Sequence, residues 1–286
     1  MSRRAFVAAS AGTLLSAGWK RRAPGLTARD IIARIQAGVG VPWREKTVDT
    51  FKAGDPAIVV TGIATTAMAT LGVLQKAAAA GRNLVITHEP LFYAAGDEPG
   101  PRATDPVYLA KQAFIADHHL AVWRFYDHWL ARQPGELPRA LAETLGWSVR
   151  DSDNERLYSI PPTTLGAVVR DARDRLQLRG GMRVVGALDT PVRRVFVSAG
   201  TTDLASTVAN LPHADLILSG EPREWEAVEY VADTASAGAP RSMIALGRIV
   251  SEEPGMRACA AWLRRLLPDV PVEAIATGDP YWRPVL

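Results

Sequence analysis

Residues 84–90 read LVITHEP, and residues 216–222 read LILSGEP. Each stretch begins with an apolar run as long as a buried strand and ends in Glu-Pro. The same features precede both: a β-branched strand, a turn of Gly and Thr residues, and a helical pattern. The two sets span residues 57–90 and 194–222. Two β-α-β units with the same ending suggest a duplicated half-domain, and chance similarity between ordinary units is the alternative.

The alternation of strands and helices continues outside these two units. Thr27, with Asp30 three residues later, is typical of a capped helix start. Gly81 is placed to end the helix predicted over residues 66–80 by adopting a left-handed conformation. Strand–helix alternation of this kind predicts parallel sheet with helices on its faces. We therefore predict an α/β fold of two related halves with mixed or parallel sheets.

The predicted elements divide the chain into a first half, an intervening segment and a second half, over residues 27–150, 151–193 and 194–286. Beyond those named above, helices are expected over residues 106–119, 138–145, 164–176, 203–211, 223–234 and 255–267. Strands are expected over residues 57–63, 84–87, 121–125, 157–160, 182–185, 194–197, 216–219, 242–246 and 272–276.

The composition is that of a folded protein. Of the 286 residues, 48% are hydrophobic and 22% are charged, which excludes a disordered chain and a multi-span membrane protein. The single cysteine, Cys259, excludes an intramolecular disulfide and a thiolate-rich zinc or iron–sulfur site.

The net charge of +3 comes from the first 22 residues. They hold five basic residues, and no acid occurs before Asp30, so the remainder carries +3 − 5 = −2. Phosphate backbones require clustered positive charge, and we therefore expect no nucleic-acid partner.

The N-terminus has the pattern of an export signal. Arg3 and Arg4 follow a serine and precede a short, mildly apolar run that ends near Gly18, which resembles a twin-arginine signal. The run is too short to be a stable membrane anchor. We predict export to the periplasm with a signal over residues 1–22, cleaved near residue 18. A basic amphipathic helix is the alternative.

Histidines and carboxylates follow three separate predicted strands. His88 and Glu89 end the first heptapeptide, and Asp127 and His128 follow the next strand. Glu252 follows the strand before the last predicted helix. Carboxyl ends of parallel strands meet at one sheet edge, where such folds place their sites. Imidazole and carboxylate together suit zinc, iron or manganese, although a structural histidine beside a capping acid is the alternative for His88 and Glu89.

Three further residues are candidates for this site. Arg248 stands four residues before Glu252, so a helical turn places both on one face. Glu221 occupies the place in the second unit that Glu89 has in the first, and is a candidate general base or an orienting residue. Tyr126 adjoins the predicted Asp127 site. The sequence contains no glycine-rich nucleotide-binding motif and no nucleophile elbow.

Together these motifs resemble the NIF-three-like family of proteins with a dinuclear metal centre, often labelled GTP cyclohydrolase I type 2. The resemblance runs from about Thr27 to Trp282 and is most specific over residues 84–93, 214–225 and 246–255. It implies two related α/β halves, a homo-oligomeric ring that is most often a hexamer, and metal-dependent chemistry.

The resemblance also implies a ligand set. His88 matches the family's first metal-binding histidine, and Glu89 stands where a second histidine is usual. Asp127 matches the aspartate after the third strand, and Glu252 matches the glutamate of a late motif.

Arg248 departs from the family pattern, because it stands where a ligand histidine is usual. Arginine is a permanent cation and cannot coordinate a metal. One metal position is then lost, weakened or completed by His128, so of one or two divalent ions per chain, one is favoured. We expect an exported metal-dependent hydrolase of an unknown small molecule. The alternative is a non-enzymatic oligomeric metal-binding or scaffold protein with a degenerate site.

Overall fold

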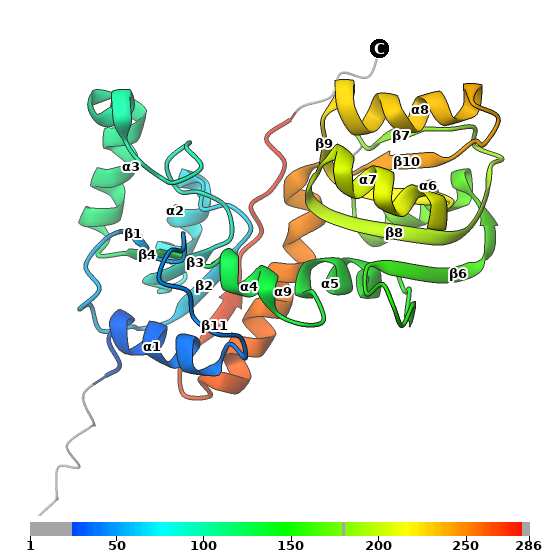
Figure 1. Ribbon diagram of the computed structural model, residues 1–286. Helices are drawn as coiled ribbons and strands as arrows, with labels where there is room; N and C mark the ends of the chain where they lie inside the picture. Colours follow the sequence, from blue (N-terminus) through cyan, green and yellow to red (C-terminus); the bar gives the residue numbers. More distant parts are fainter. Residues whose placement is uncertain (1–24, 179–180, 282–286) are drawn as a thin grey trace, which may run out of the picture.

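Two α/β halves lie side by side in the computed structural model, which describes residues 25–178 and 181–281 (Figure 1). The predicted signal over residues 1–22 lies outside the described residues. The first sheet has the order β1-β4-β3-β2-β11 and the second has the order β5-β6-β8-β9-β10-β7. Both sheets are mixed, with parallel strands at their centres, as the sequence predicts.

In the first sheet, strands β2, β3, β4 and β11 run parallel, and β1 pairs antiparallel with β4. The strands of the first sheet are β1 (Phe51–Ala53), β2 (Ile63–Thr66), β3 (Leu84–Thr87), β4 (Ala121–Arg124) and β11 (Val272–Ala274). Those of the second are β5 (Val149–Arg150), β6 (Leu157–Thr164), β7 (Arg183–Val185), β8 (Pro191–Thr202), β9 (Leu216–Pro222) and β10 (Ser242–Ala245).

Helices cover both faces of each sheet. On the first sheet, α1 and α9 cover one face and α2 and α3 the other, while α5 and α6 face α7 and α8 across the second sheet. Their bounds are α1 (Ala28–Gly38), α2 (Leu71–Ala79), α3 (Pro106–Asp117), α4 (Asp127–Ala131), α5 (Glu136–Thr144), α6 (Leu165–Arg175), α7 (Leu204–Asn210), α8 (Glu229–Ser236) and α9 (Arg248–Leu266). Short 3₁₀ turns span Gly100–Thr104 and Leu211–His213, and a π-helical turn spans Glu224–Val228.

Apolar strands with two covered faces explain the buried runs of the sequence. In β3, Leu84 and Ile86 pack in the core under α1 and α9, whereas Val85 packs under α2 and α3. Because successive side chains of a strand point to opposite faces, a strand between two helical layers is apolar at every position. The heptapeptide at residues 84–90 is therefore a central strand followed by its site residues.

Local signals place several boundaries as predicted. The Thr27 hydroxyl accepts from the backbone N–H of Asp30 at 3.2 Å, and the Asp30 carboxylate accepts from the backbone N–H of Thr27 at 2.9 Å, which completes a capping box. Gly81 adopts a φ of 68° directly after α2 and its C-cap. Glycine enters that left-handed region without steric cost.

Several elements start elsewhere than predicted. The helix predicted over residues 66–80 begins at Leu71, and the strand predicted over residues 194–197 begins at Pro191. The β-branched run over residues 57–62 forms only a single bridge, between Thr27 and Val59, and sheet pairing begins at Ile63. The strand prediction was therefore shifted, because the sheet neighbours of these residues are not encoded locally. Helix α9 begins at Arg248, seven residues before the predicted start at residue 255, and it continues through Pro254. Arg248 and Glu252 thus lie in its first turns.

The chain crosses between the halves more often than the predicted division allows. The segment over residues 151–193 contributes β6 and β7 to the second sheet, and β11 returns to the first. Helix α9 lies between the halves, beside α5, and its Met256 and Leu263 join the core of the first half (Figure 1). A site at the start of α9 therefore faces both sheets.

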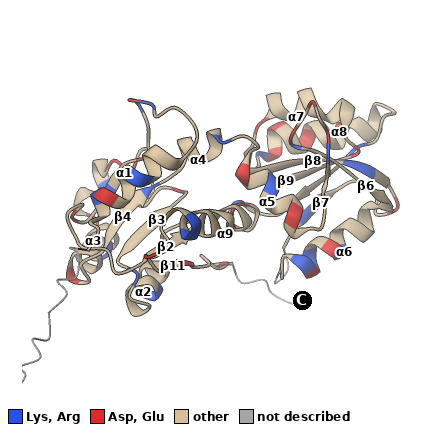
Figure 2. Cartoon of the chain, turned by 90° about the horizontal axis from the view of Figure 1, so that it is seen from below, with Lys and Arg blue, Asp and Glu red and all other residues tan. Residues whose placement is uncertain are grey.

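Charge is distributed over both halves. Lys and Arg segments alternate with Asp and Glu segments on the two halves in the view of Figure 2.

None of the helices within residues 25–178 and 181–281 combines the length and apolar character needed to cross a membrane.

Candidate metal centre

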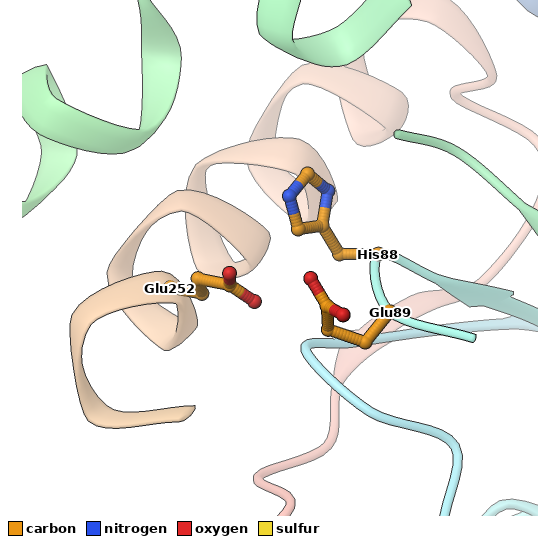
Figure 3. Close-up of side chains that lie close together, drawn as sticks. All are labelled: His88, Glu89 and Glu252. Carbon is orange, nitrogen blue, oxygen red and sulfur yellow. The ribbon is translucent and has the colours of Figure 1, made fainter. Parts of the chain in front are cut away.

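Three of the four predicted ligands come together between the halves. His88 and Glu89 follow the end of β3, and Glu252 lies on α9 (Figure 3). One ligand atom from each lies within 4.8 Å of the others, and all three residues are buried. This convergence follows from parallel strands ending at one edge, against which the start of α9 packs.

His88 is held with one nitrogen free. Its Nδ1 lies 3.1 Å from the backbone carbonyl oxygen of Phe125. A carbonyl only accepts, so Nδ1 carries the proton and the Nε2 lone pair is available to a ligand. Burial lowers the pKa of His88 to about 3, which keeps the ring neutral. The ring of Tyr126 lies 4.6 Å from that of His88.

The two buried carboxyl groups favour a positive charge between them, either a proton or a cation. Burial raises the pKa of Glu252 well above its usual value, and the charge of Glu89 raises it further, whereas Arg248 opposes the rise. Oε2 of Glu252 is buried and has no hydrogen-bond partner in the described part of the chain. A buried acceptor without a donor costs free energy, which a bound cation would recover.

Arg248 supplies part of this positive charge. Its Nη2 donates to Glu89 Oε1 at 2.8 Å, and its Nη1 donates to Glu221 Oε2 at 3.3 Å. Its Nε lies 3.4 Å from Glu252 Oε1. Burial by itself would lower the pKa of Arg248, but the carboxylates of Glu89 and Glu252 outweigh it and raise that pKa. The two equivalent Glu-Pro glutamates of the sequence thus share one guanidinium.

Asp127, the fourth predicted ligand, is held elsewhere. Its Oδ2 accepts from the hydroxyl of Thr47 at 2.8 Å and from the backbone N–H of Val48 at 3.1 Å. Its Oδ1 lies 3.3 Å from Arg44 Nη2. Among the residues that the structure describes, the compact ligand group does not include Asp127.

His128 is engaged at both ring nitrogens. Its Nδ1 lies 2.7 Å from Asp49 Oδ2, and its Nε2 accepts from the backbone N–H of Arg44 at 3.0 Å. The ring stacks on Trp43 at 3.6 Å. Neither nitrogen has a lone pair left for a metal, so this histidine holds the chain before β1 against α4.

Two positions that support this region were missed from the sequence. Asp49 accepts from the backbone N–H groups of Tyr126, Asp127 and His128, which caps the start of α4. Gly200 has a φ of 76°, and a Cβ at this position would lie 2.8 Å from Glu252 Oε1. Asp49 lies far from its partners in sequence, and only the Gly-Thr turn marked Gly200.

A pocket of about 220 Å³ adjoins the ligand group. Its polar lining includes two groups of the site, His88 and Glu252. The other polar lining residues are Tyr126 at the start of α4, Glu155 and Arg156 just before β6, and Thr201 on β8.

A buried histidine and two glutamates at the edge of two related α/β halves define an α/β protein with a candidate divalent-metal site. The family model of Duf34/NIF3 (NGG1p interacting factor 3) matches residues 48–280, and the chain belongs to this family. The resemblance read from the sequence is thereby confirmed.

Solved structures share the fold. A Staphylococcus aureus hypothetical protein, SA1388, is 16% identical with a TM-score of 0.71, covering 91% of this chain and 99% of that chain. A Bacillus cereus protein related to NIF3 is 14% identical with a TM-score of 0.71, covering 90% and 99%. Reduced HcgD from Methanocaldococcus jannaschii is 18% identical with a TM-score of 0.63, covering 87% and 97%. A search of curated proteins found no match.

Proposed function

We propose that this protein is an exported hydrolase that uses one divalent metal ion per chain. The observation that carries the proposal is the buried group of His88, Glu89 and Glu252 beside a pocket. Imidazole and carboxylate ligands suit zinc, iron and manganese. The unpartnered Oε2 of Glu252 and the free Nε2 of His88 are the donor atoms that best fit such an ion.

The residues around the group have distinct roles in this proposal. When bound, the ion would act as a Lewis acid on the substrate and lower the pKa of a coordinated water. The Phe125 carbonyl orients His88 through Nδ1. Glu221 is more exposed than the other carboxylates, with 58% of its side-chain surface accessible, and it would accept a proton as general base.

Arg248 limits the site to one ion. Its guanidinium is a fixed positive charge that contacts three carboxylates, those of Glu89, Glu221 and Glu252. A second divalent cation would meet repulsion in a buried, weakly screened setting.

The same contacts favour a second candidate function. With Arg248 neutralising the carboxylates, the protein would be a non-enzymatic oligomeric metal-binding or scaffold protein. The family membership also motivates a homo-oligomer, for which we propose a hexamer. Light scattering would then report about six times the chain mass of 30.8 kDa, and a monomer would contradict the proposal.

Metal analysis and hydrolysis assays together test these functions. The full chain is loaded separately with zinc, iron(II) and manganese, desalted and analysed for metal, and then assayed on ester, amide and phosphoester substrates. His88→Ala should lower occupancy about tenfold or more, since a ligand is lost. His118→Ala is the matched control, because His118 is exposed. Bound metal with no hydrolysis supports the metal-binding form of the second candidate, and no bound metal rejects the hydrolase and leaves only the scaffold.

A further inference from the structure

Arg156 is a pocket residue that the metal proposal does not use. It lies just before β6 and lines the pocket that also contains His88 and Glu252. The side chain is half-buried, and no described carboxylate lies within ion-pair distance, 4.0 Å, of its guanidinium, although the charges of Asp203 and Glu155 act on it from farther away. Arg124, the more deeply buried arginine, is by contrast paired with Asp97 at 3.5 Å.

The guanidinium of Arg156 is held in one orientation. Its Nε donates to the backbone carbonyl of Val197 at 3.1 Å, and its Nη2 donates to Ser198 Oγ at 2.8 Å. The guanidinium carbon also lies 4.5 Å from the centre of the Phe196 ring. These contacts use the edge of the fork formed by Nε and Nη2. Both N–H groups of Nη1 and one of Nη2 have no acceptor among the described residues.

The neighbouring acid is occupied by other donors. Glu155, the next residue in the chain, accepts from the backbone N–H of Gly135 at 3.1 Å. The side-chain amide of Gln133, with its nitrogen turned toward Glu155, donates at 3.0 and 2.6 Å to its two carboxylate oxygens. Glu155 is thus directed toward the segment before α5. The positive charge of Arg156 is partly desolvated and has no contacting counter-ion, which is costly without a ligand.

We propose that Arg156 binds the oxyanion of a small acidic substrate, a carboxylate or a phosphate group, through its free end-on N–H pair. A planar fork matches the two oxygens of such a group. The pocket volume of about 220 Å³ lies below the range of about 300–1,000 Å³ for drug-sized ligands. The part of the substrate that this pocket holds is therefore small, and a small acid fits it best. The inference rests on the proposed function in placing the hydrolysed bond beside His88 and Glu252, but the anion contact requires no metal.

Titration calorimetry of the metal-free full chain tests the contact with two probes, inorganic phosphate and succinate, at constant ionic strength. We expect at least one to bind, and Arg156→Gln to weaken that binding about 10-fold or more, because a charge-assisted pair is lost. Arg156→Lys should bind with intermediate affinity, since it keeps the charge without the fork. Arg193→Gln is the matched control: it removes the same charge from an exposed position on β8, and should bind as the unmutated chain does.

The outcomes separate this inference from the metal proposal. If neither probe binds the unmutated chain, or if Arg156→Gln and Arg193→Gln bind alike, the inference is wrong whatever the metal content. Retained phosphate or succinate binding in metal-free His88→Ala supports the anion contact even if the metal proposal fails. Where Arg156→Gln does not fold, Arg156→Lys alone decides: affinity equal to that of the unmutated chain rejects the fork.

Discussion

The guanidinium of Arg248 donates from Nη2 to Oε1 of Glu89 at 2.8 Å, across 159 positions of sequence. The contact joins the start of α9 to the end of β3, and therefore joins the elements of the two halves at the candidate site. A side chain that cannot ligate a metal thus holds a residue that can. The consequences for metal stoichiometry can be measured directly.

Arg248→His should raise metal occupancy above that of the unmutated chain. A neutral imidazole adds a ligand. The substitution also removes the guanidinium that contacts Glu89, Glu221 and Glu252 and repels a metal ion. Elemental analysis after identical loading and desalting measures the change, and we expect at most one tightly held ion in the unmutated protein. Two ions per unmutated chain would show that the role given to Arg248 is wrong.

Gly200→Ala should destabilise the fold and weaken metal binding. The new Cβ would lie 2.8 Å from Glu252 Oε1 and would also occupy a φ of 76°. The backbone strain of a residue with a side chain at positive φ costs about 1–2 kcal/mol, and displacement of Glu252 adds to this cost. The control is Gly40→Ala, at a φ of 81° with nothing within 4 Å. Denaturant unfolding and metal titration of both variants separate the contact with Glu252 from the backbone strain. Equal losses of stability and of metal affinity in the two variants would contradict a role for that contact.

His128→Ala should lower stability without changing metal occupancy. The ring is buried between Trp43 and the Asp49 carboxylate, and its removal leaves that carboxylate with one donor fewer. We expect a loss of about 2–4 kcal/mol in the free energy of unfolding. Occupancy measured on the folded variant is the second readout. A fall in bound metal comparable to that of His88→Ala would return His128 to the ligand set.

Lys111 should make the protein more stable at alkaline pH. Burial lowers its pKa from the ordinary value of 10.5 to about 8, with Asp97 opposing the shift. Between these values the unfolded chain binds the proton and the folded chain does not, so the free energy of unfolding rises with pH. The gain from pH 8 to 10.5 is about 3 kcal/mol.

Lys111→Met isolates this contribution, because all other groups titrate in both proteins. In the unmutated chain the Nζ of Lys111 donates to the Leu91 carbonyl at 2.6 Å. The variant loses this hydrogen bond at every pH. Unfolding curves at several pH values should show the unmutated chain gaining on the variant from pH 8 to 10.5. Parallel stabilities over that range would refute the shift.

Arg3→Lys combined with Arg4→Lys should leave the protein in the cytoplasm at full length. The paired arginines are the feature that motivates the export proposal. Fractionation and mass analysis of the double variant give the location and the N-terminus. A processed protein in the periplasm would remove the twin-arginine assignment.

Local sequence patterns predicted the fold class and named as candidates all three residues of the compact group, His88, Glu89 and Glu252. The strand over residues 84–87 has its predicted bounds. A strand between two helical layers is a continuous apolar run, and such a run can be recognised from the local sequence alone. The capping box of Thr27 and Asp30 acts over three residues. His88 and Glu89 were selected as candidates because the end of a central parallel strand is where open α/β sheets place side chains for chemistry.

Tertiary structure alone decided which of the candidate groups meet. Asp127 and His128 follow a strand just as His88 does, yet their partners lie about 80 residues earlier in the segment before β1. Arg248 contacts three carboxylates, whereas Arg156 contacts none among the described residues. Charge compensation and hydrogen bonding depend on distances of a few ångströms between segments remote in sequence, and no local pattern encodes those distances.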